Sequence, residues 1–96
     1  MKRTLHTLRV PSDVAELIRS LHPHLKKKIR SSLQAIISDP DSGKALKEEL
    51  AGLRSFRVGN FRIIYRVGEG AQIEIIAVGP RKNIYDETYK LLKKGR

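Results

Sequence analysis

The 96-residue sequence contains no cysteine. This absence excludes disulfide bonds, thiolate zinc sites and cysteine nucleophiles. No apolar run approaches the roughly 20 residues that a membrane-spanning helix requires. The initial segment, MKRTLHTLRV, lacks the apolar stretch and the small-residue cleavage site of a secretory signal. We therefore expect a cytoplasmic location and no membrane partner.

Motifs that bind metals or nucleotides are also missing. The histidines, His6, His22 and His24, do not have the spacing of a metal site. The carboxylates are scattered and include no pair typical of a two-metal nuclease. There is no G-x-x-x-x-G-K-[ST] phosphate loop. The sequence predicts neither a metal ion nor a cofactor.

Positive charge is what the chain has in excess. Lys and Arg number 20 against 10 Asp and Glu, which gives a formal net charge of +10. Such an excess indicates a polyanionic partner: nucleic acid, an acidic protein or a membrane surface. A chain of this length needs its apolar helix stripes for a core of its own, so nucleic acid is favoured. We expect one domain over residues 1–96.

Hydrophobic periodicity predicts the element order β-α-α-β-β-β-α. Ser12 or Asp13 is positioned to cap the first helix, and the apolar stripes of the helix pair are expected to cover one sheet face. The result is an α+β fold: a largely antiparallel four-stranded sheet, an N-terminal helix pair and a C-terminal helix. Outside the helix pair, the expected elements are a strand at 3–10, a short helix at 44–50, strands at 53–58, 61–67 and 72–79, and a helix at 82–94.

Arginines recur on the polar face of the first predicted hairpin. Gly59-Asn60, taken as a two-residue turn, places Arg57 opposite Arg62. Two like charges directly across a hairpin destabilise it, unless both project into solvent or share an anion. Arg66 lies on the same face and Arg81 follows the next strand. Because arginine matches phosphate well, we interpret the group as an anion site.

The same register, continued through the next hairpin, makes two further predictions. Arg62 would face Ala77, whose small side chain either leaves space for a ligand or fits beneath a neighbour. On the opposite face, Arg54 and Glu74 would form a structural pair.

Arg81 and Tyr85 are spaced i, i+4 and would share a face if the segment is helical. Tyr85 could contact a scissile phosphate, stack on a base or simply pack the last helix. A site without metal or a histidine pair favours RNA over DNA, because RNA carries its own nucleophile, the 2′-OH. Arginines would stabilise the charge of the phosphorane.

Two segments resemble a known family. SGKALKEELAGLRSFRVGNFRIIYRV and IEIIAVGPRKNIY are similar to the RelE/ParE toxin superfamily, on the RelE side, and the resemblance covers nearly the whole chain. It implies a RelE-like fold and the toxin of a type II toxin–antitoxin module. RelE-like members are mRNA interferases, metal-independent endoribonucleases that typically cleave mRNA on the ribosome by 2′-OH attack. The partners implied are a cognate antitoxin, mRNA, the ribosome and, only through the antitoxin complex, operator DNA.

The resemblance also implies roles for individual residues. Arg57 and Arg62 correspond to the strand cations that bind phosphate. Arg81 corresponds to the cation at the scissile phosphate or leaving group, and Tyr85 to the tyrosine that stacks or exchanges protons. Some active members carry a lysine where this chain has Ser55, which leaves the general base open. The remaining candidates for substrate binding are Lys44, Lys47, Arg54 and Arg66.

Two other functions remain open from the sequence. A ParE-like inhibitor of DNA gyrase would have the same fold and no nuclease site. A non-catalytic RNA-binding toxin would account for the serine at position 55.

Overall fold

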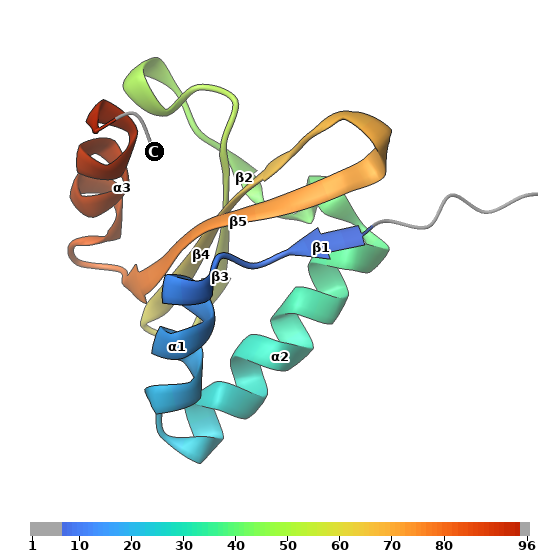
Figure 1. The fold of residues 1–96 in the computed structure, drawn as a ribbon, viewed down its shortest axis with the longest axis vertical. Helices are drawn as coiled ribbons and strands as arrows, with labels where there is room; N and C mark the ends of the chain where they lie inside the picture. The colour runs from blue at the N-terminus through green and yellow to red at the C-terminus, as the bar shows by residue number, and fades with distance from the viewer. Residues whose placement is uncertain (1–6, 95–96) are drawn as a thin grey trace, which may run out of the picture.

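The computed structural model describes residues 7–94 of the chain, which form a sheet with helices on both faces (Figure 1). The 5-stranded sheet has the order β1-β5-β4-β3-β2. β1 pairs with β5 in parallel, and the other neighbours are antiparallel. The strands are β1 (Thr7–Arg9), β2 (Lys44–Ala45), β3 (Arg54–Val58), β4 (Phe61–Val67) and β5 (Gln72–Pro80). The helices are α1 (Ser12–Ser20), α2 (Pro23–Ser38) and α3 (Ile84–Lys93), with 3-10 turns η1 (Pro40–Ser42), η2 (Glu48–Leu50) and η3 (Glu69–Ala71).

The two faces of the sheet carry separate apolar cores. α1 and α2 cover one face, where Ile29 and Ile36 pack with Ile63 and Tyr65. α3 covers the other face, which carries the cluster Leu53, Ile64, Ile76, Ala77 and Ile84. Cross-strand partners share a face, so the register assigns each paired strand residue to one of these two layers. None of the helices within residues 7–94 has the length and apolar character needed to span a bilayer.

The predicted helix pair is confirmed, but its predicted cap is wrong. Pro11 is the N-cap of α1 and no side chain caps this end. Ser12 and Asp13 lie inside the helix, where an acidic residue in the first turn still complements the helix dipole. α2 ends at Ser38, and the residue that follows precedes Pro40, a position that disfavours helical backbone. Of the strand expected at 3–10, residues 3–6 lie outside the described part.

The short helix predicted for residues 44–50 is absent. Lys44 and Ala45 instead form an edge strand opposite Ser55 and Arg54. The N–H of Leu46 extends this pairing with a 2.9 Å bond to the carbonyl of Leu53. Only η2 follows, and it starts with Glu48 at a φ of 56°. This left-handed residue interrupts the helical pattern, and β2 becomes the fifth strand of the sheet.

The register predicted for the second hairpin is also wrong. Arg62 lies opposite Gly79, and Ile64 lies opposite Ala77, because the connection offsets the pairing by one residue and the pairing shifts once more between Ile64 and Tyr65. The connection is not a two-residue turn but η3, closed by a 2.7 Å bond from the N–H of Gly68 to the carbonyl of Gln72.

The different connection also separates Arg54 from Glu74, which the sequence had predicted to be paired. Arg54 lies opposite Tyr65, and Tyr65 lies opposite Ile75. Glu74 instead lies opposite Arg66 and forms an ion pair with it.

Candidate functional site

The arginine pair predicted for the first hairpin is present. Arg57 on β3 lies directly opposite Arg62 on β4. The neighbouring pair Ser55 and Ile64 occupies the α3 face, and alternation along each strand places both arginines on that face as well. Arg57 is exposed and Arg62 is half-buried. The two guanidinium groups therefore project from the sheet next to the start of α3.

Arg62 is held by two neighbours, neither of which carries a negative charge. Its Nη1 donates to Ser55 Oγ at 3.0 Å. Its guanidinium carbon lies 5.9 Å from the centroid of the Tyr85 ring, at the outer limit of a cation–π contact. Its Nε is buried without a hydrogen-bond partner. No carboxylate of residues 7–94 forms an ion pair with Arg62.

Ser55 connects the strands to the last helix. Its side chain is 2% exposed, and its Oγ also accepts a 3.1 Å hydrogen bond from the hydroxyl of Tyr85. The sequence does not predict these contacts of Ser55, and the family resemblance marks it only as a serine where some members carry a lysine. The available signal was the strand alternation, which places a small polar residue on a face that α3 must cover.

A groove beside Tyr85 brings two of the predicted lysines to the same place. Lys44 lies opposite Ser55 across β2 and β3 and so shares its face. The groove has a volume of about 330 Å³ and is lined by Lys44, Ala45, Leu46, Lys47, Leu50 and Tyr85. In Figure 1 the segment that contains η2 lies beside α3.

Arg81 lies in the turn before α3, not inside the helix. Arg81 and Tyr85 therefore do not share a helix face. The backbone N–H of Arg81 donates to the carbonyl of Asn60 at 2.7 Å, which holds this residue at the β3–β4 turn. Arg81 also lines a separate hollow of about 380 Å³ with Asn60, Pro80 and Lys82. It borders the end of the hairpin that carries the arginine pair.

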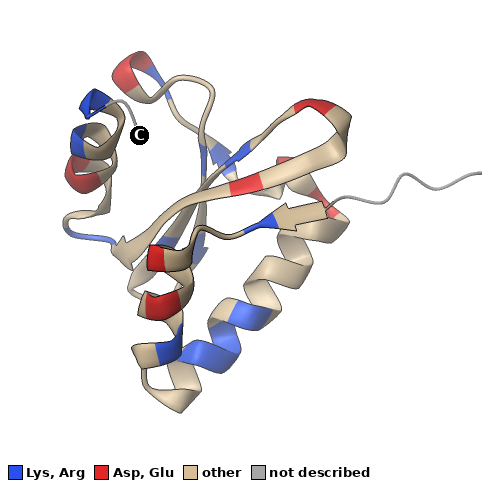
Figure 2. Cartoon of the chain, viewed as in Figure 1, with Lys and Arg blue, Asp and Glu red and all other residues tan. Residues whose placement is uncertain are grey.

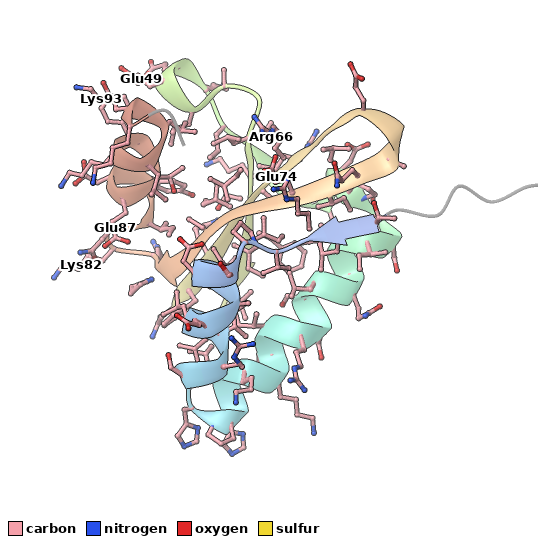
Figure 3. All side chains as sticks on the ribbon, viewed as in Figure 1. Glu49, Arg66, Glu74, Lys82, Glu87 and Lys93 are labelled. Carbon is pink, nitrogen blue, oxygen red and sulfur yellow. The ribbon has the colours of Figure 1, made fainter. Side chains whose placement is uncertain are left out.

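Arg54 and Arg66 are not part of this cluster. Arg54 projects from the α2 face, donates to the carbonyl of Gly43 at 2.6 Å and forms an ion pair with Asp41 at 3.4 Å. Arg66 points toward Glu74 near the far end of the β4–β5 hairpin (Figure 3). Both arginines are thus engaged in structural contacts, and the structure gives no support to their predicted role in substrate binding.

Lys and Arg also lie on the first half of α2, on the strands and on α3 (Figure 2). Within the described residues, no group of three or more His, Cys, Asp and Glu is placed to hold a metal ion. His22 and His24 stack with ring centroids 5.6 Å apart at the start of α2.

Comparison with known proteins identifies the family of this chain. The family model described as the ParE toxin of the type II toxin–antitoxin system parDE matches residues 7–85. The chain belongs to the ParE toxin family. This ParE-family protein is thus a toxin of a type II toxin–antitoxin system, within the RelE/ParE superfamily. The match runs from β1 to Tyr85 and includes the arginine pair and Arg81.

Solved structures of related toxins have the same fold as this ParE-family toxin. It resembles the RelBE2 toxin–antitoxin complex from Mycobacterium tuberculosis, with 28% identity, a TM-score of 0.71 and coverage of 83% of this chain and 95% of that one. For a mutant of the Escherichia coli toxin RelE in the free state, the identity is 16%, the TM-score 0.69 and the coverage 90% and 92%. For the RelE–RelB complex from Pyrococcus horikoshii OT3 the values are 21%, 0.67, 80% and 96%. No curated protein sequence matches the toxin.

Proposed function

We propose that this toxin is a metal-independent endoribonuclease that cleaves mRNA on the ribosome. The observation that carries the proposal is Arg62, a half-buried cation that forms no ion pair with a described carboxylate, held against Tyr85 and facing a second arginine. Burying an uncompensated charge costs free energy, as does placing two like charges across a hairpin. A bound phosphodiester would offset both costs.

The proposed reaction uses a nucleophile from the substrate. The 2′-oxygen attacks the adjacent phosphorus as its proton leaves, the bond from phosphorus to the 5′-oxygen breaks, and that oxygen takes up a proton. The products are a 2′,3′-cyclic phosphate and a 5′-hydroxyl. Arg57 and Arg62 would contact the non-bridging oxygens and stabilise the charge that develops on them. Arg81, at the end of the same hairpin, would contact the phosphate or the leaving group.

Substrate positioning would come from the groove next to the arginine pair. The Tyr85 ring offers a surface on which a base can stack. Lys44 and Lys47 line the same groove and would attract neighbouring phosphates. A site without a histidine or carboxylate base depends strongly on the alignment of the reacting atoms, which the ribosome would supply by holding the mRNA.

Induction of the toxin in cells, with mapping of new transcript ends, tests the proposal. Wild-type toxin should produce cuts phased with codons. Arg62→Ala should restore growth while the fold survives, with a loss of cleavage on the order of 10²–10³-fold for one electrostatic contact. Arg81→Ala is expected to act in the same direction. Arg30→Ala, an exposed arginine on α2, is the matched control. Full toxicity of both soluble site variants would contradict the proposal.

Inhibition of DNA gyrase is the second candidate function, and the match to the ParE family model favours it. It would act through a protein interface and would not require the arginine cluster. Induction would then cause DNA breaks and an SOS response, and purified toxin would block supercoiling by gyrase. A toxin that gives neither phased cuts nor DNA breaks would be a non-catalytic RNA-binding protein.

We also propose a cognate antitoxin as the protein partner. The related structures from M. tuberculosis and P. horikoshii are complexes of toxin with antitoxin. The formal net charge of +10 suits an acidic antitoxin segment. Operator DNA would be bound only by the complex, and mRNA only by the free toxin in the cytoplasm. A short acidic protein encoded by the neighbouring reading frame is the expected partner, and co-purification with the toxin tests it.

A further inference from the structure

We propose that Ser55 is the positioning residue of the site, because its hydroxyl fixes Arg62 and Tyr85 relative to each other. The inference rests on the proposed nuclease function, in which Arg62 and Tyr85 contact the substrate. Ser55 itself does not contact the substrate, since its side chain is 2% exposed. It acts through its two partners.

Two donors from different elements converge on the one oxygen of Ser55. Arg62 Nη1 on β4 lies 3.0 Å from Oγ, and the Tyr85 hydroxyl on α3 lies 3.1 Å from it. Arg62 also lies beneath the Tyr85 ring, so the three side chains form a closed set of contacts. Through Ser55, strand β3 is thereby linked by hydrogen bonds to both β4 and α3.

The chemistry of serine fits this role. A buried hydroxyl is costly unless it is hydrogen-bonded, and its oxygen has two lone pairs for two donors. Ser55 lies in a cross-strand row with Lys44, Ile64 and Ala77 on the α3 face. A short side chain at this position lets Arg62 and Tyr85 meet above it, and an apolar residue would leave both donors without a partner.

The contact to Ser55 determines which edge of Arg62 is left for a ligand. Nη1 is committed to Ser55 and Nε is enclosed. The Nη2 amino group makes no hydrogen bond within the described residues and is not among the buried unpartnered atoms. It is therefore the group that is free to bind a phosphate oxygen. Similarly, Tyr85 donates its proton to Ser55, which leaves its oxygen able to accept a hydrogen bond from a ribose hydroxyl or water.

This role differs from that of the lysine that some active relatives carry at the same place. A lysine would bring charge and a titratable proton, whereas Ser55 brings neither. We infer that in this chain the position orients the site and transfers no proton. The alignment of Arg62 and Tyr85 then contributes to turnover more than to substrate binding.

Three variants test the assignment by cleavage of mRNA on programmed ribosomes. Ser55→Ala removes the shared oxygen and should lower kcat by about 10–100-fold, the range expected for a misplaced catalytic group, with KM nearly unchanged. Ser55→Thr keeps a hydroxyl and should restore most of kcat. Thr88→Val is the matched control: it removes another buried hydroxyl, on α3, whose bond goes to the carbonyl of Ile84 in its own helix.

Side-chain NMR of Arg62 gives a readout that does not depend on activity. In the wild type the anchored guanidinium N–H groups should exchange slowly with water, and in Ser55→Ala they should exchange rapidly. Tyr85→Phe breaks one bond to Ser55 and retains the ring, so it should change the same Arg62 signals if Ser55→Ala proves too unstable to study.

The outcomes separate the two proposals. If wild-type toxin cleaves RNA and Ser55→Ala matches Thr88→Val in both kcat and NMR, the assignment of Ser55 is overturned. If wild-type toxin cleaves no RNA, the proposed function fails. In that case, slow exchange of the Arg62 N–H groups that becomes rapid in Ser55→Ala still supports the positioning role of Ser55. Exchange that is unchanged in Ser55→Ala refutes that role.

Discussion

Arg57 and Arg62 face each other across the β3–β4 hairpin, and no carboxylate within residues 7–94 forms an ion pair with either. The free protein therefore bears a repulsion that lowers the stability of this hairpin. Residues that lower stability in this way are typical of functional sites. Substitution of either arginine can therefore raise the stability of the fold and lower the activity of the toxin.

Arg57→Gln should stabilise the fold and weaken the toxin. Removal of one of two facing cations is expected to raise the free energy of unfolding by about 0.2–1 kcal/mol, most clearly at low salt. If the toxin is the proposed nuclease, cleavage of mRNA should fall, because one proposed phosphate contact is lost. Urea unfolding and ribosome-dependent cleavage measure the two effects. Arg30→Gln is the control and should change neither. Lower stability of Arg57→Gln would show that the pair is not repulsive.

Tyr65→Phe should make the free energy of unfolding of the toxin less sensitive to pH in the alkaline range. The buried Tyr65 hydroxyl donates to the carbonyl of Pro40 at 2.6 Å and accepts from the N–H of Gly43 at 3.0 Å. Burial raises the pKa of Tyr65. The phenol is neutral in both states below its ordinary pKa of about 10, and above it the unfolded state ionises first. Stability from the neutral phenol is therefore complete below pH ~10 and is lost as pH rises through the folded pKa.

Urea titrations from pH 8 to 11 would measure this effect. At pH 8 the Tyr65→Phe variant should be less stable by about 1–3 kcal/mol, because the Gly43 N–H loses its partner. Above pH ~10 the difference from wild type should shrink. Deprotonation of lysines affects both proteins and cancels in the difference. A constant difference across the range would contradict the raised pKa.

Gly43→Ala should destabilise the fold through contact with the same tyrosine. A Cβ at position 43 would lie 2.5 Å from the Tyr65 Oη and 2.9 Å from its ring. The buried ring has little room to move, so we expect a loss of about 1–3 kcal/mol. Gly68→Ala is the control, because the nearest atom would be 3.6 Å away, and it should change the unfolding free energy little. Similar melting temperatures for the two variants would refute this packing argument.

Gly79→Ala should affect activity more than stability. Gly79 lies opposite Arg62, and a Cβ there would come within 3.0 Å of Ile84 Cδ1. Ile84 opens α3 and precedes Tyr85, so a shift of a few tenths of an ångström would be passed on to the Ser55 hydrogen bond. The expected result is a stability loss of about 1 kcal/mol with a clear fall in kcat. Unchanged cleavage would mean that the site tolerates movement of α3.

The accuracy of the sequence predictions differed between the two hairpins for a physical reason. A two-residue turn such as Gly59-Asn60 admits one pairing, so the Arg57–Arg62 pair was predicted correctly. The β4–β5 connection has positive φ values at Gly70 and Ala71, and the pairing shifts between Ile64 and Tyr65. Periodicity does not signal either feature, so Arg62 was assigned to Ala77 and not to Gly79.

The candidate site was predictable only where it follows from local patterns. Alternation along the strands and the Gly59-Asn60 turn predicted the facing cations Arg57 and Arg62. The contacts of Ser55 depend on the packing of α3 against a strand about 30 residues earlier, which local periodicity does not contain. Likewise β2 is a strand only because β3 lies next to it, since two residues have no strand preference of their own.

The position of β5 has a consequence for how the toxin is made. β5 has a partner strand on each side, and residues 7–9 pair with residues 72–74. A nascent chain leaves the ribosome N-terminus first, so β1 stays without its partner until most of the polypeptide has been synthesised. A translation product that stops before β5 carries Arg57 and Arg62 but lacks Tyr85 and the strand that completes the sheet. Copies of this toxin that stop before β5 should therefore be inactive.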